Sequence, residues 1–338
     1  MAMMAAAGKQ YETYRVSVQE YVTFREQGFL VVKGLVPQED VQEMLEHLDN
    51  LLAGREQIPG IERPSFRLNA DEQVQYWQRV HMLHRLLPLH ERFLLHPRVL
   101  DVLEALIGPD VLALQSMTFF KLPGQPGQGY HQDSYYIPTF PDSLCGAWVA
   151  LDRADEENGC LWMTAGSQNE PVYPDPDGHN YGQRELGDIG SILNASHTDE
   201  NKNGLTKIAR KYVGREVKAE VDPGDVVFFG GHILHRSHSN HSQDRKRRAF
   251  VGHYCNARSW VPWNHGESYE GEAANDKHIL ARGTTHLPYA QPKFGTPCAA
   301  NTPDLAQRYR VAGKAMSMMG NMDGTMGMSE HGEEVHED

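Results

Sequence analysis

Apolar positions in the first third of the chain repeat with the period of an α-helix. Between residues 37 and 54 they fall on one stripe of such a helix: Val41, Met44, Leu45, Leu48, Leu51 and Leu52. Proline at the start of this segment and glycine at its end are typical helix boundaries. A capping box at Ser17-Val-Gln-Glu20 predicts another helix, which ends at Gly28, and residues 97–107 predict a third. We interpret these stripes as packing faces.

From about residue 111 the pattern changes to short runs of β-branched and aromatic residues separated by turn-forming residues. Such runs predict strands, which we expect at residues 111–122, 146–151, 160–164, 216–221, 226–229 and 249–255. Asn158-Gly159 and Pro223-Gly-Asp225 are turn signals of the kind that joins antiparallel strands. Helices followed by strands favour a mainly β, α+β fold. In this fold a helical flank over residues 10–110 packs on an antiparallel barrel or sandwich.

Two polar segments stand apart from this pattern. Residues 173–214 interrupt the predicted strands, and an insertion of this length is typical of a lid, a binding loop or disorder. We favour a functional loop. Residues 315–338 hold six methionines and six acidic residues but no lysine or arginine, so we expect a disordered tail. The chain is therefore predicted to form a single domain over residues 1–314, with its β core at 111–260.

Composition and charge narrow the range of partners. The 338 residues include 32 basic and 45 acidic side chains, which gives a formal net charge of −13. An acidic chain has no positive field to attract nucleic acid or an anionic membrane, so a small molecule is the expected partner. The four cysteines form no CxxC pair, as is typical of reduced thiols, and no segment resembles a signal peptide or membrane span. We expect a soluble, cytoplasmic protein of undefined oligomeric state.

Two groups of histidines are placed where they could bind a metal. His131 and Asp133 follow a predicted strand, and alternate side chains of an extended segment share a face, so both can point into one cavity. Histidines then recur at every third residue behind a later strand: His232, His235, His238 and His241. One of these would complete the two imidazoles and one carboxylate of non-haem Fe(II) oxygenases. A solvated turn, or a zinc site made by neighbouring histidines, is the alternative.

The motifs around these residues resemble those of the phytanoyl-CoA dioxygenase family of Fe(II)/2-oxoglutarate oxygenases. The similarity runs from about Gln115 to Tyr254, with a looser likeness over residues 24–52. It is carried, in chain order, by HQD, GAWVALD, EENGCL, AGS, PGDVVFF, HxSxxNxS and RRA. The resemblance implies a double-stranded β-helix, the cupin-like jelly roll, with the N-terminal helices packed on it.

The resemblance also implies a metal-ligand set of His131, Asp133 and His235. His235 is favoured among its neighbours because the serines and the asparagine of HxSxxNxS follow it at the family's spacing. The family has glycine directly after this histidine, whereas this chain has Arg236, so the local turn is expected to differ.

A second set of residues is implied for 2-oxoglutarate. Arg247 would bind its distal carboxylate, because a planar guanidinium suits bidentate pairing. Arg248 is the alternative, since the gap from the histidine is one residue longer than the family's pattern. The other implied residues are Ser237 as a hydroxyl partner, Lys121 as a nearby basic group, and Trp148 as an aromatic wall or plain core.

The implied enzyme is a dioxygenase that binds Fe(II) and uses 2-oxoglutarate and O₂ to hydroxylate an unactivated C–H bond of a small molecule. Succinate and CO₂ are released. Halogenating relatives lack the carboxylate ligand, so Asp133 favours hydroxylation. Tyr135 and Tyr136 could contact substrate or serve in packing. Two alternatives remain: a non-catalytic or zinc-binding jelly-roll protein, and a cupin-type metalloenzyme that does not use 2-oxoglutarate. The substrate could be an acyl-CoA, a small polar metabolite or a natural product.

Overall fold

The computed structural model describes residues 9–60, 79–175, 189–193, 195, 204–265, 273–285 and 293–294. In the larger sheet the strands are β1 (Phe29–Val32), β2 (Arg79–His81), β3 (Val111–Lys121), β5 (Cys145–Ala150), β8 (Val226–Gly230), β10 (Arg247–Asn256), β11 (Ile279–Arg282) and β12 (Lys293–Phe294). In the smaller sheet they are β4 (Gln128–His131), β6 (Leu161–Thr164), β7 (Glu216–Ala219) and β9 (His235–Ser237). The helices are α1 (Val18–Gln27), α2 (Gln38–Ala53), α4 (Pro88–Leu94), α5 (Pro97–Ile107) and α6 (Leu205–Ala209).

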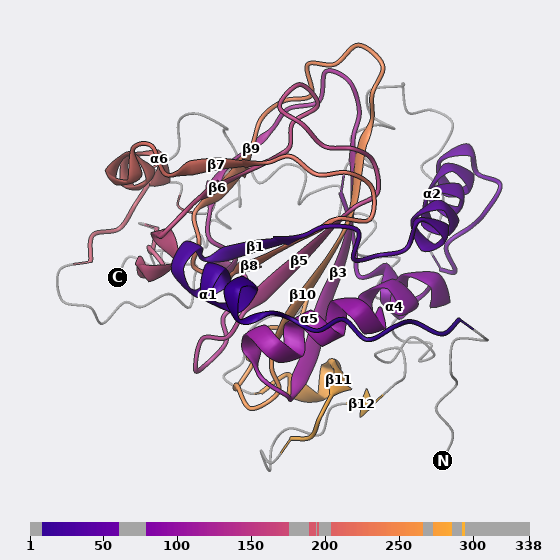
Figure 1. Ribbon diagram of the computed structural model, residues 1–338, viewed down its shortest axis with the longest axis horizontal. Helices are drawn as coiled ribbons and strands as arrows, with labels where there is room; N and C mark the ends of the chain where they lie inside the picture. The colour runs from indigo at the N-terminus through magenta and orange to yellow at the C-terminus, as the bar shows by residue number, and fades with distance from the viewer. Residues whose placement is uncertain are drawn as a thin grey trace, which may run out of the picture.

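The two sheets lie one over the other. Helices α1, α4 and α5 lie on the outer side of the larger sheet, whereas α6 lies beside the smaller one (Figure 1). Over the described residues the strand order is β1-β8-β5-β10-β3-β11-β12 in the larger sheet, with β2 also paired to β3, and β4-β9-β6-β7 in the smaller one. Pairing is antiparallel except between β11 and β12. This arrangement confirms the predicted jelly roll with a helical flank.

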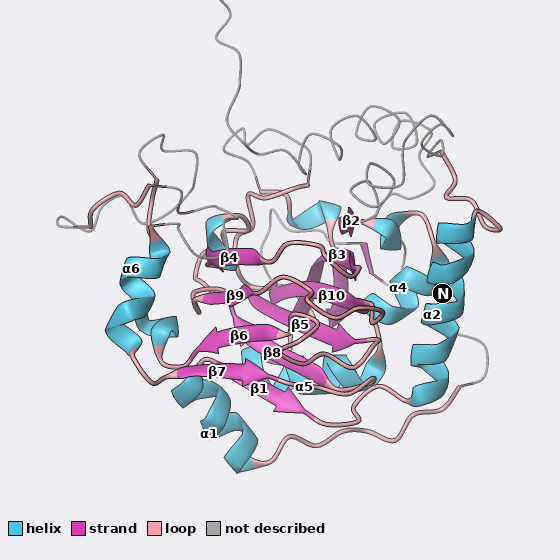
Figure 2. Cartoon of the chain, turned by 90° about the horizontal axis from the view of Figure 1, so that it is seen from above, coloured by secondary structure: helices cyan, strands magenta, loops and turns pink. Residues whose placement is uncertain are grey.

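The three helices expected from the sequence are present at the expected places. Ser17 accepts from the backbone N–H of Glu20, and the Glu20 side chain accepts from the backbone of Ser17, so the capping box at α1 is complete. Gly54 ends α2 in the left-handed conformation, with φ of 68°. Helices α4 and α5 lie beneath the larger sheet in Figure 1, and in Figure 2 α2 and α6 flank the sheets at opposite ends.

Strand alternation divides the side chains of the larger sheet between two cores. On β10, Phe250 and Tyr254 point to the helices, where they join the core made with α2, α4 and α5. Ala249 and Val251 point the other way, into the space between the sheets. Because successive side chains of a strand point to opposite faces, Arg247 and His253 share the inner face and Arg248 shares the outer one.

The sequence pattern locates six strands but leaves out the shortest or least apolar ones. Strands β3, β5, β6, β7, β8 and β10 match the prediction to within three residues at either end. The helical interpretation of the first third did not include β1 and β2, which extend the larger sheet.

Part of the 173–214 insertion forms α6, whose apolar side chains Leu205 and Ile208 are buried. The predicted tail at 315–338 lies outside the described residues. Among the residues described, no helix has the length and hydropathy needed to span a membrane.

Candidate metal centre

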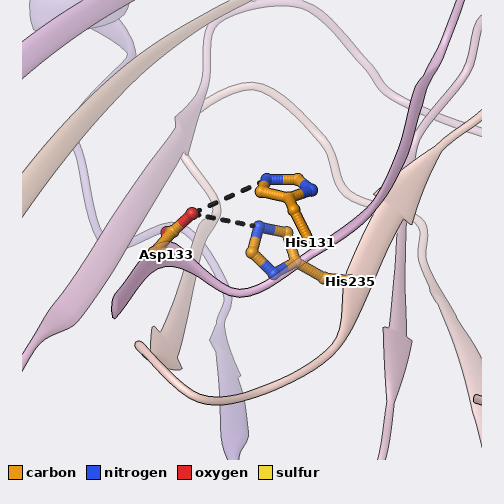
Figure 3. A group of neighbouring side chains, drawn as sticks. All are labelled: His131, Asp133 and His235. Carbon is orange, nitrogen blue, oxygen red and sulfur yellow. Dashed lines mark ion pairs between the residues drawn. The ribbon is translucent and has the colours of Figure 1, made fainter. Parts of the chain in front are cut away.

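His131, Asp133 and His235 come together between the two sheets. His131 is the last residue of β4 and His235 the first of β9, and these two histidines are directly opposite one another in the antiparallel pair. Asp133 follows two residues later, at the start of a short 3-10 turn, Asp133–Tyr135. The Oδ1 atom of Asp133 lies 3.6 Å from Nε2 of His131 and 3.7 Å from Nε2 of His235. Figure 3 shows the three side chains pointing toward one another.

The second nitrogen of each imidazole is fixed by the backbone. Nδ1 of His131 lies 2.9 Å from the carbonyl of Gly129, and Nδ1 of His235 lies 3.1 Å from that of Ile233. A carbonyl can only accept, so each Nδ1 carries the proton and each Nε2 presents its lone pair to the space shared with Asp133. These two hydrogen bonds to the backbone orient both rings, and no sequence motif predicts them.

His253 on β10 holds the carboxylate. Its Nε2 lies 3.0 Å from Oδ2 of Asp133, which leaves Oδ1 directed at the two other histidines. Burial disfavours the charged form of Asp133, but attraction to His235 and the hydrogen bond from His253 outweigh it and lower the pKa of this carboxyl. Burial, together with His235, lowers the pKa of His131 to about 3. Asp133 is therefore a carboxylate and His131 a neutral imidazole at pH 7, the states that bind metals.

These donors fit a divalent metal with open coordination positions. Among the described residues, this trio is the group of three metal-binding side chains whose ligand atoms all lie within 4.8 Å of one another, and all three are buried. Donors at about 2.1 Å from a common ion, on neighbouring positions, lie about 3 Å apart, so small rotamer changes would close the observed distances. Two imidazoles and one carboxylate on one side suit Fe(II). The donor set provides no thiolate, which structural zinc usually requires.

Two other histidines of the four-histidine run, His232 and His238, make contacts elsewhere. Nδ1 of His232 lies 2.8 Å from the carbonyl of Glu170, and the ring of His238 contacts the ring of Trp162 edge-on. Arg236 on β9 stands where the family has glycine, and its side chain points away from the metal site. Its guanidinium donates to both carboxylate oxygens of Glu216, at 2.8 and 3.0 Å, and lies over the ring of Tyr130.

Two neighbouring arginines at the start of β10 have opposite environments. Arg248 donates to both oxygens of Asp152, at 2.8 and 2.9 Å, and to Asp49 of α2 at 2.9 Å. Arg247 is buried on the inner face, its guanidinium lies 5.4 Å from the ring centre of Trp148, and no described residue forms an ion pair with it. Burial lowers the pKa of Arg247 to about 10. Of these two neighbours, Arg247 is thus the one whose charge has no anion among the described residues.

Lys121 and Ser237 lie next to Arg247. Lys121 and Arg247 are register partners on β3 and β10, so their side chains share the inner face. The ammonium of Lys121 donates to Oγ of Ser237 at 2.9 Å and to the carbonyl of His238 at 2.6 Å. Gly159, the second residue of the predicted Asn-Gly turn, has φ of 81°, and a side chain there would collide with that same carbonyl. The turn therefore needs glycine beside Lys121.

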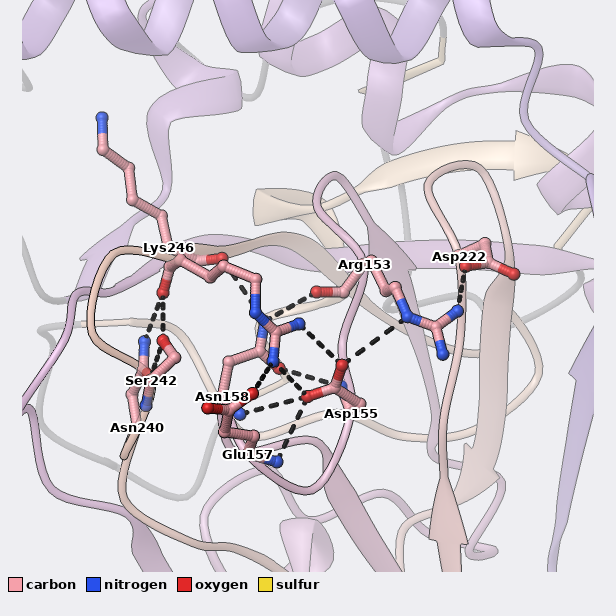
Figure 4. A network of polar contacts seen from close by, with 9 residues as sticks. Arg153, Asp155, Glu157, Asn158, Asp222, Asn240, Ser242 and Lys246 are labelled. Atoms are coloured by element: carbon pink, nitrogen blue, oxygen red, sulfur yellow. Dashed lines mark hydrogen bonds and ion pairs between the residues drawn. The ribbon is translucent and has the colours of Figure 1, made fainter.

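The serine and asparagine that follow Ser237 in the motif shape the loop between β9 and β10. The amide of Asn240 donates to the carbonyls of Lys121 at 3.1 Å and Arg245 at 2.7 Å, and Ser242 donates to Oδ1 of Asn240 at 2.6 Å. Figure 4 shows Asn240 and Ser242 of this loop in one polar network with Asp155. Asp155 forms an ion pair with Arg245 at 2.6 Å. These contacts hold the loop against the end of β3 just before β10 begins at Arg247.

The remaining predicted residues surround the centre. The ring of Tyr136 contacts His131 edge-on, with ring centres 6.4 Å apart, and Tyr135 donates to Asp175. Trp148 is buried in the core between the sheets and also contacts the guanidinium of Arg247. Its role as an aromatic wall of the co-substrate site stays a prediction. His253 had no sequence signal, because a single polar residue within a strand has no pattern that marks it.

Comparisons with known proteins agree with this geometry. The family model described as phytanoyl-CoA dioxygenase matches residues 24–249. "Phytanoyl-CoA dioxygenase domain-containing protein 1" of Danio rerio is 26% identical over 295 residues, covering 73% of this chain and 93% of that protein. The peroxisomal phytanoyl-CoA dioxygenase of Bos taurus is 27% identical over 252 residues, covering 72% and 69%.

Solved structures share the fold. The 2-oxoglutarate-dependent epimerase SnoN of nogalamycin biosynthesis superposes with a TM-score of 0.55 at 20% identity, covering 81% of this chain and 98% of its own. A nickel complex of the non-haem monooxygenase ThoJ gives a TM-score of 0.56 at 17% identity, covering 89% and 98%.

Proposed function

The chain belongs to the phytanoyl-CoA dioxygenase family and is an Fe(II)/2-oxoglutarate-dependent oxygenase, and from this premise we propose that His131, Asp133 and His235 hold its iron. We further propose that it hydroxylates an unactivated C–H bond of a small molecule. The convergence of two backbone-fixed imidazoles and one carboxylate in a buried site is the observation that carries the proposal. A carboxylate at Asp133 favours hydroxylation over halogenation.

Arg247, Lys121 and Ser237 are proposed to bind the distal carboxylate of 2-oxoglutarate. A buried guanidinium without a counter-ion is unfavourable, and a bidentate carboxylate would neutralise it with two charge-assisted hydrogen bonds. Arg248 already has its anions, Asp152 and Asp49, and is assigned to the scaffold.

Each group then has a defined task in the reaction. Bound Fe(II), with 2-oxoglutarate and O₂, supplies the oxidative decarboxylation to succinate and CO₂ and the oxidant for the C–H bond. His131 and His235 would bind the metal through the lone pair of Nε2, because their Nδ1–H groups donate hydrogen bonds to backbone carbonyls. His253 keeps Oδ1 of Asp133 directed at the metal, and Arg247 orients the co-substrate. Burial of all three ligands keeps bulk water from the reacting groups.

The setting of the enzyme follows from its composition. A net charge of −13 supports a small-molecule substrate and not nucleic acid. Three described cysteines, Cys145, Cys160 and Cys255, are buried free thiols, which supports a reducing compartment such as the cytoplasm. We also propose that residues 1–314 act as one oxygenase domain, with 173–214 as a substrate-facing insertion.

The test compares wild type, Asp133→Ala, and a control, Asp222→Ala, in which an exposed carboxylate paired with Arg153 is removed. Each protein is incubated with Fe(II), 2-oxoglutarate and O₂ and with a panel of candidate metabolites. We expect wild type and the control to release succinate. Asp133→Ala should unfold at a temperature close to that of wild type but lose metal binding and turnover.

Three results would contradict the proposal. Equal succinate release by Asp133→Ala would remove this carboxylate from the ligand set. Zinc binding without turnover of 2-oxoglutarate would favour the non-catalytic jelly roll. Substrate oxidation that neither needs nor consumes 2-oxoglutarate would favour the cupin-type metalloenzyme.

A further inference from the structure

A second cationic side chain without an anion lies beside the metal ligands. Arg79 on β2 is the register partner of Phe119 on β3, and its guanidinium lies 5.3 Å from the centre of the Phe119 ring. Phe119 packs against the core between the sheets, so Arg79 points to the same inner space as Lys121, two residues further along β3. Arg79 is half-buried, and no carboxylate of the described residues forms an ion pair with it.

Gln128 connects Arg79 to the metal centre. Nη2 of Arg79 donates to Oε1 of Gln128 at 3.2 Å, and Nε2 of the same amide lies 3.1 Å from Nε2 of His131. A metal ion would occupy the lone pair of that histidine nitrogen. Because the lone pair can no longer accept from Gln128, the amide N–H groups become available to a ligand next to the guanidinium. Arg79 and Gln128 would then present a fork of donors beside the metal.

Two carboxylates around the metal ligands and Tyr136 already have partners. Asp133 faces the two histidines through Oδ1 and accepts from His253 through Oδ2. Asp175 accepts from Tyr135. Attraction to Tyr136 and Asp133 is felt at Arg79, but burial outweighs it and lowers the pKa of the guanidinium. Among the described residues, no carboxylate therefore forms an ion pair that compensates the charge of Arg79.

The charge of the site favours an anionic substrate. Arg79, Lys121 and Arg247 are cationic, as is a divalent metal, whereas Asp133 and the two carboxylates of 2-oxoglutarate are the anions. This balance leaves the buried site positive with metal and co-substrate in place, and such a field favours a further anion. The distal carboxylate of 2-oxoglutarate is matched to Arg247 and its other carboxylate to the metal, so neither requires Arg79.

We propose that Arg79 and Gln128 bind a carboxylate of the prime substrate and hold the adjoining carbon chain over the metal centre. This inference rests on the proposed function, because it takes 2-oxoglutarate to be bound at Arg247. A single guanidinium with one amide suits a carboxylate, which accepts two parallel N–H bonds. The enzyme's substrates would accordingly be carboxylic acids, with oxidation a few bonds from the acid group.

The test uses acetate, a carboxylate small enough to fit whatever the shape of the site, and acetamide as its neutral match. Protein is loaded with Mn(II) and 2-oxoglutarate, and paramagnetic broadening of the methyl proton signal reports a probe bound within a few ångströms of the metal. We expect saturable broadening of acetate but not acetamide in wild type. Arg79→Gln should weaken acetate binding about tenfold or more, and Arg79→Lys should retain part of it. Exposed Arg210→Gln is the matched control.

The arms of the experiment separate the possible failures. Equal broadening of acetate in wild type and Arg79→Gln would mean that acetate binds the metal directly, and equal broadening of acetamide would remove the charge argument; either overturns the proposal. A loss of 2-oxoglutarate affinity in Arg79→Gln, followed by protein fluorescence with Mn(II), would assign Arg79 to the co-substrate instead. If wild type binds no 2-oxoglutarate, the proposed function itself fails, and this inference fails with it.

Discussion

Replacing Arg247 with methionine is expected to weaken 2-oxoglutarate binding strongly while it stabilises the ligand-free protein. The two effects have one cause, because the guanidinium is buried without an anion until the co-substrate arrives. The neighbouring change, Arg248→Met, should do the reverse. It removes the partner of Asp152 and Asp49, so it should destabilise the fold but leave 2-oxoglutarate affinity close to that of wild type.

The structure sets the size of both effects. Burial lowers the pKa of Arg247 to about 10, which corresponds to about 3 kcal/mol against the charged form. The contact with Trp148 offsets about 1–2 kcal/mol of this, so the free energy of unfolding should rise by about 1–2 kcal/mol in Arg247→Met. Two charge-assisted hydrogen bonds are worth about 3 kcal/mol or more, so the dissociation constant of 2-oxoglutarate should rise roughly a hundredfold.

Urea unfolding of the metal-free proteins and titration of 2-oxoglutarate into their Mn(II) forms measure the two quantities separately. Arg248→Met should lose about 1–3 kcal/mol of stability through its unpaired carboxylates. The reasoning is refuted if Arg248→Met shows the weakened co-substrate affinity and Arg247→Met does not. It is also refuted if Arg247→Met is strongly destabilised without ligand, since the guanidinium would then have a partner in the folded protein.

Three further outcomes are expected. His253→Leu should weaken Mn(II) binding about 10–100-fold by releasing Asp133, and His253→Gln, which keeps a donor, should restore part of it; unchanged affinity in both would remove the positioning role. Hydrogen bonds from Arg245 lower the pKa of Asp155, so the contribution of Asp155 to the free energy of unfolding is present above about pH 4 and lost as the pH falls through the folded-state pKa. Asp155→Asn should therefore make the free energy of unfolding, measured with urea, depend less on pH in the acid range. Asn240→Ala should raise the apparent Michaelis constant for 2-oxoglutarate more than it lowers kcat, whereas an equal change in both would indicate a purely structural role.

Helices and long strands could be predicted because their patterns are formed by many residues. Helix α2 has an apolar stripe and a glycine stop, and β10 is a ten-residue run with an alternating inner and outer face. Strand β9 spans only His235–Ser237 and contains no apolar residue, so it has no pattern of its own. It is a strand because β4 and β6 pair with it on both sides. Tertiary pairing of this kind is invisible to local periodicity.

Only the site residues that belong to a recognisable motif could be predicted from the sequence. The HxD motif and the HxSxxNxS motif identify His131, Asp133 and His235, which the fold brings together. The choice between Arg247 and Arg248 depends on which face of β10 each occupies. That depends on where the strand begins after the loop, which the spacing from His235 does not determine. His253 and Arg79 act through partners more than forty residues away, so their roles emerge only when the strands are paired.

The alternation of β10 has a consequence for how this chain can vary. A deletion of one residue between Asn240 and Arg247, if the strand slipped to accommodate it, would turn Arg247 toward the helices. It would also move the other side chains of β10 to the opposite faces of the sheet. An insertion or deletion in this short connection can therefore disrupt the co-substrate site as a substitution of Arg247 would. Changes that preserve both arginines by identity can still inactivate the enzyme if they alter which of them faces inward.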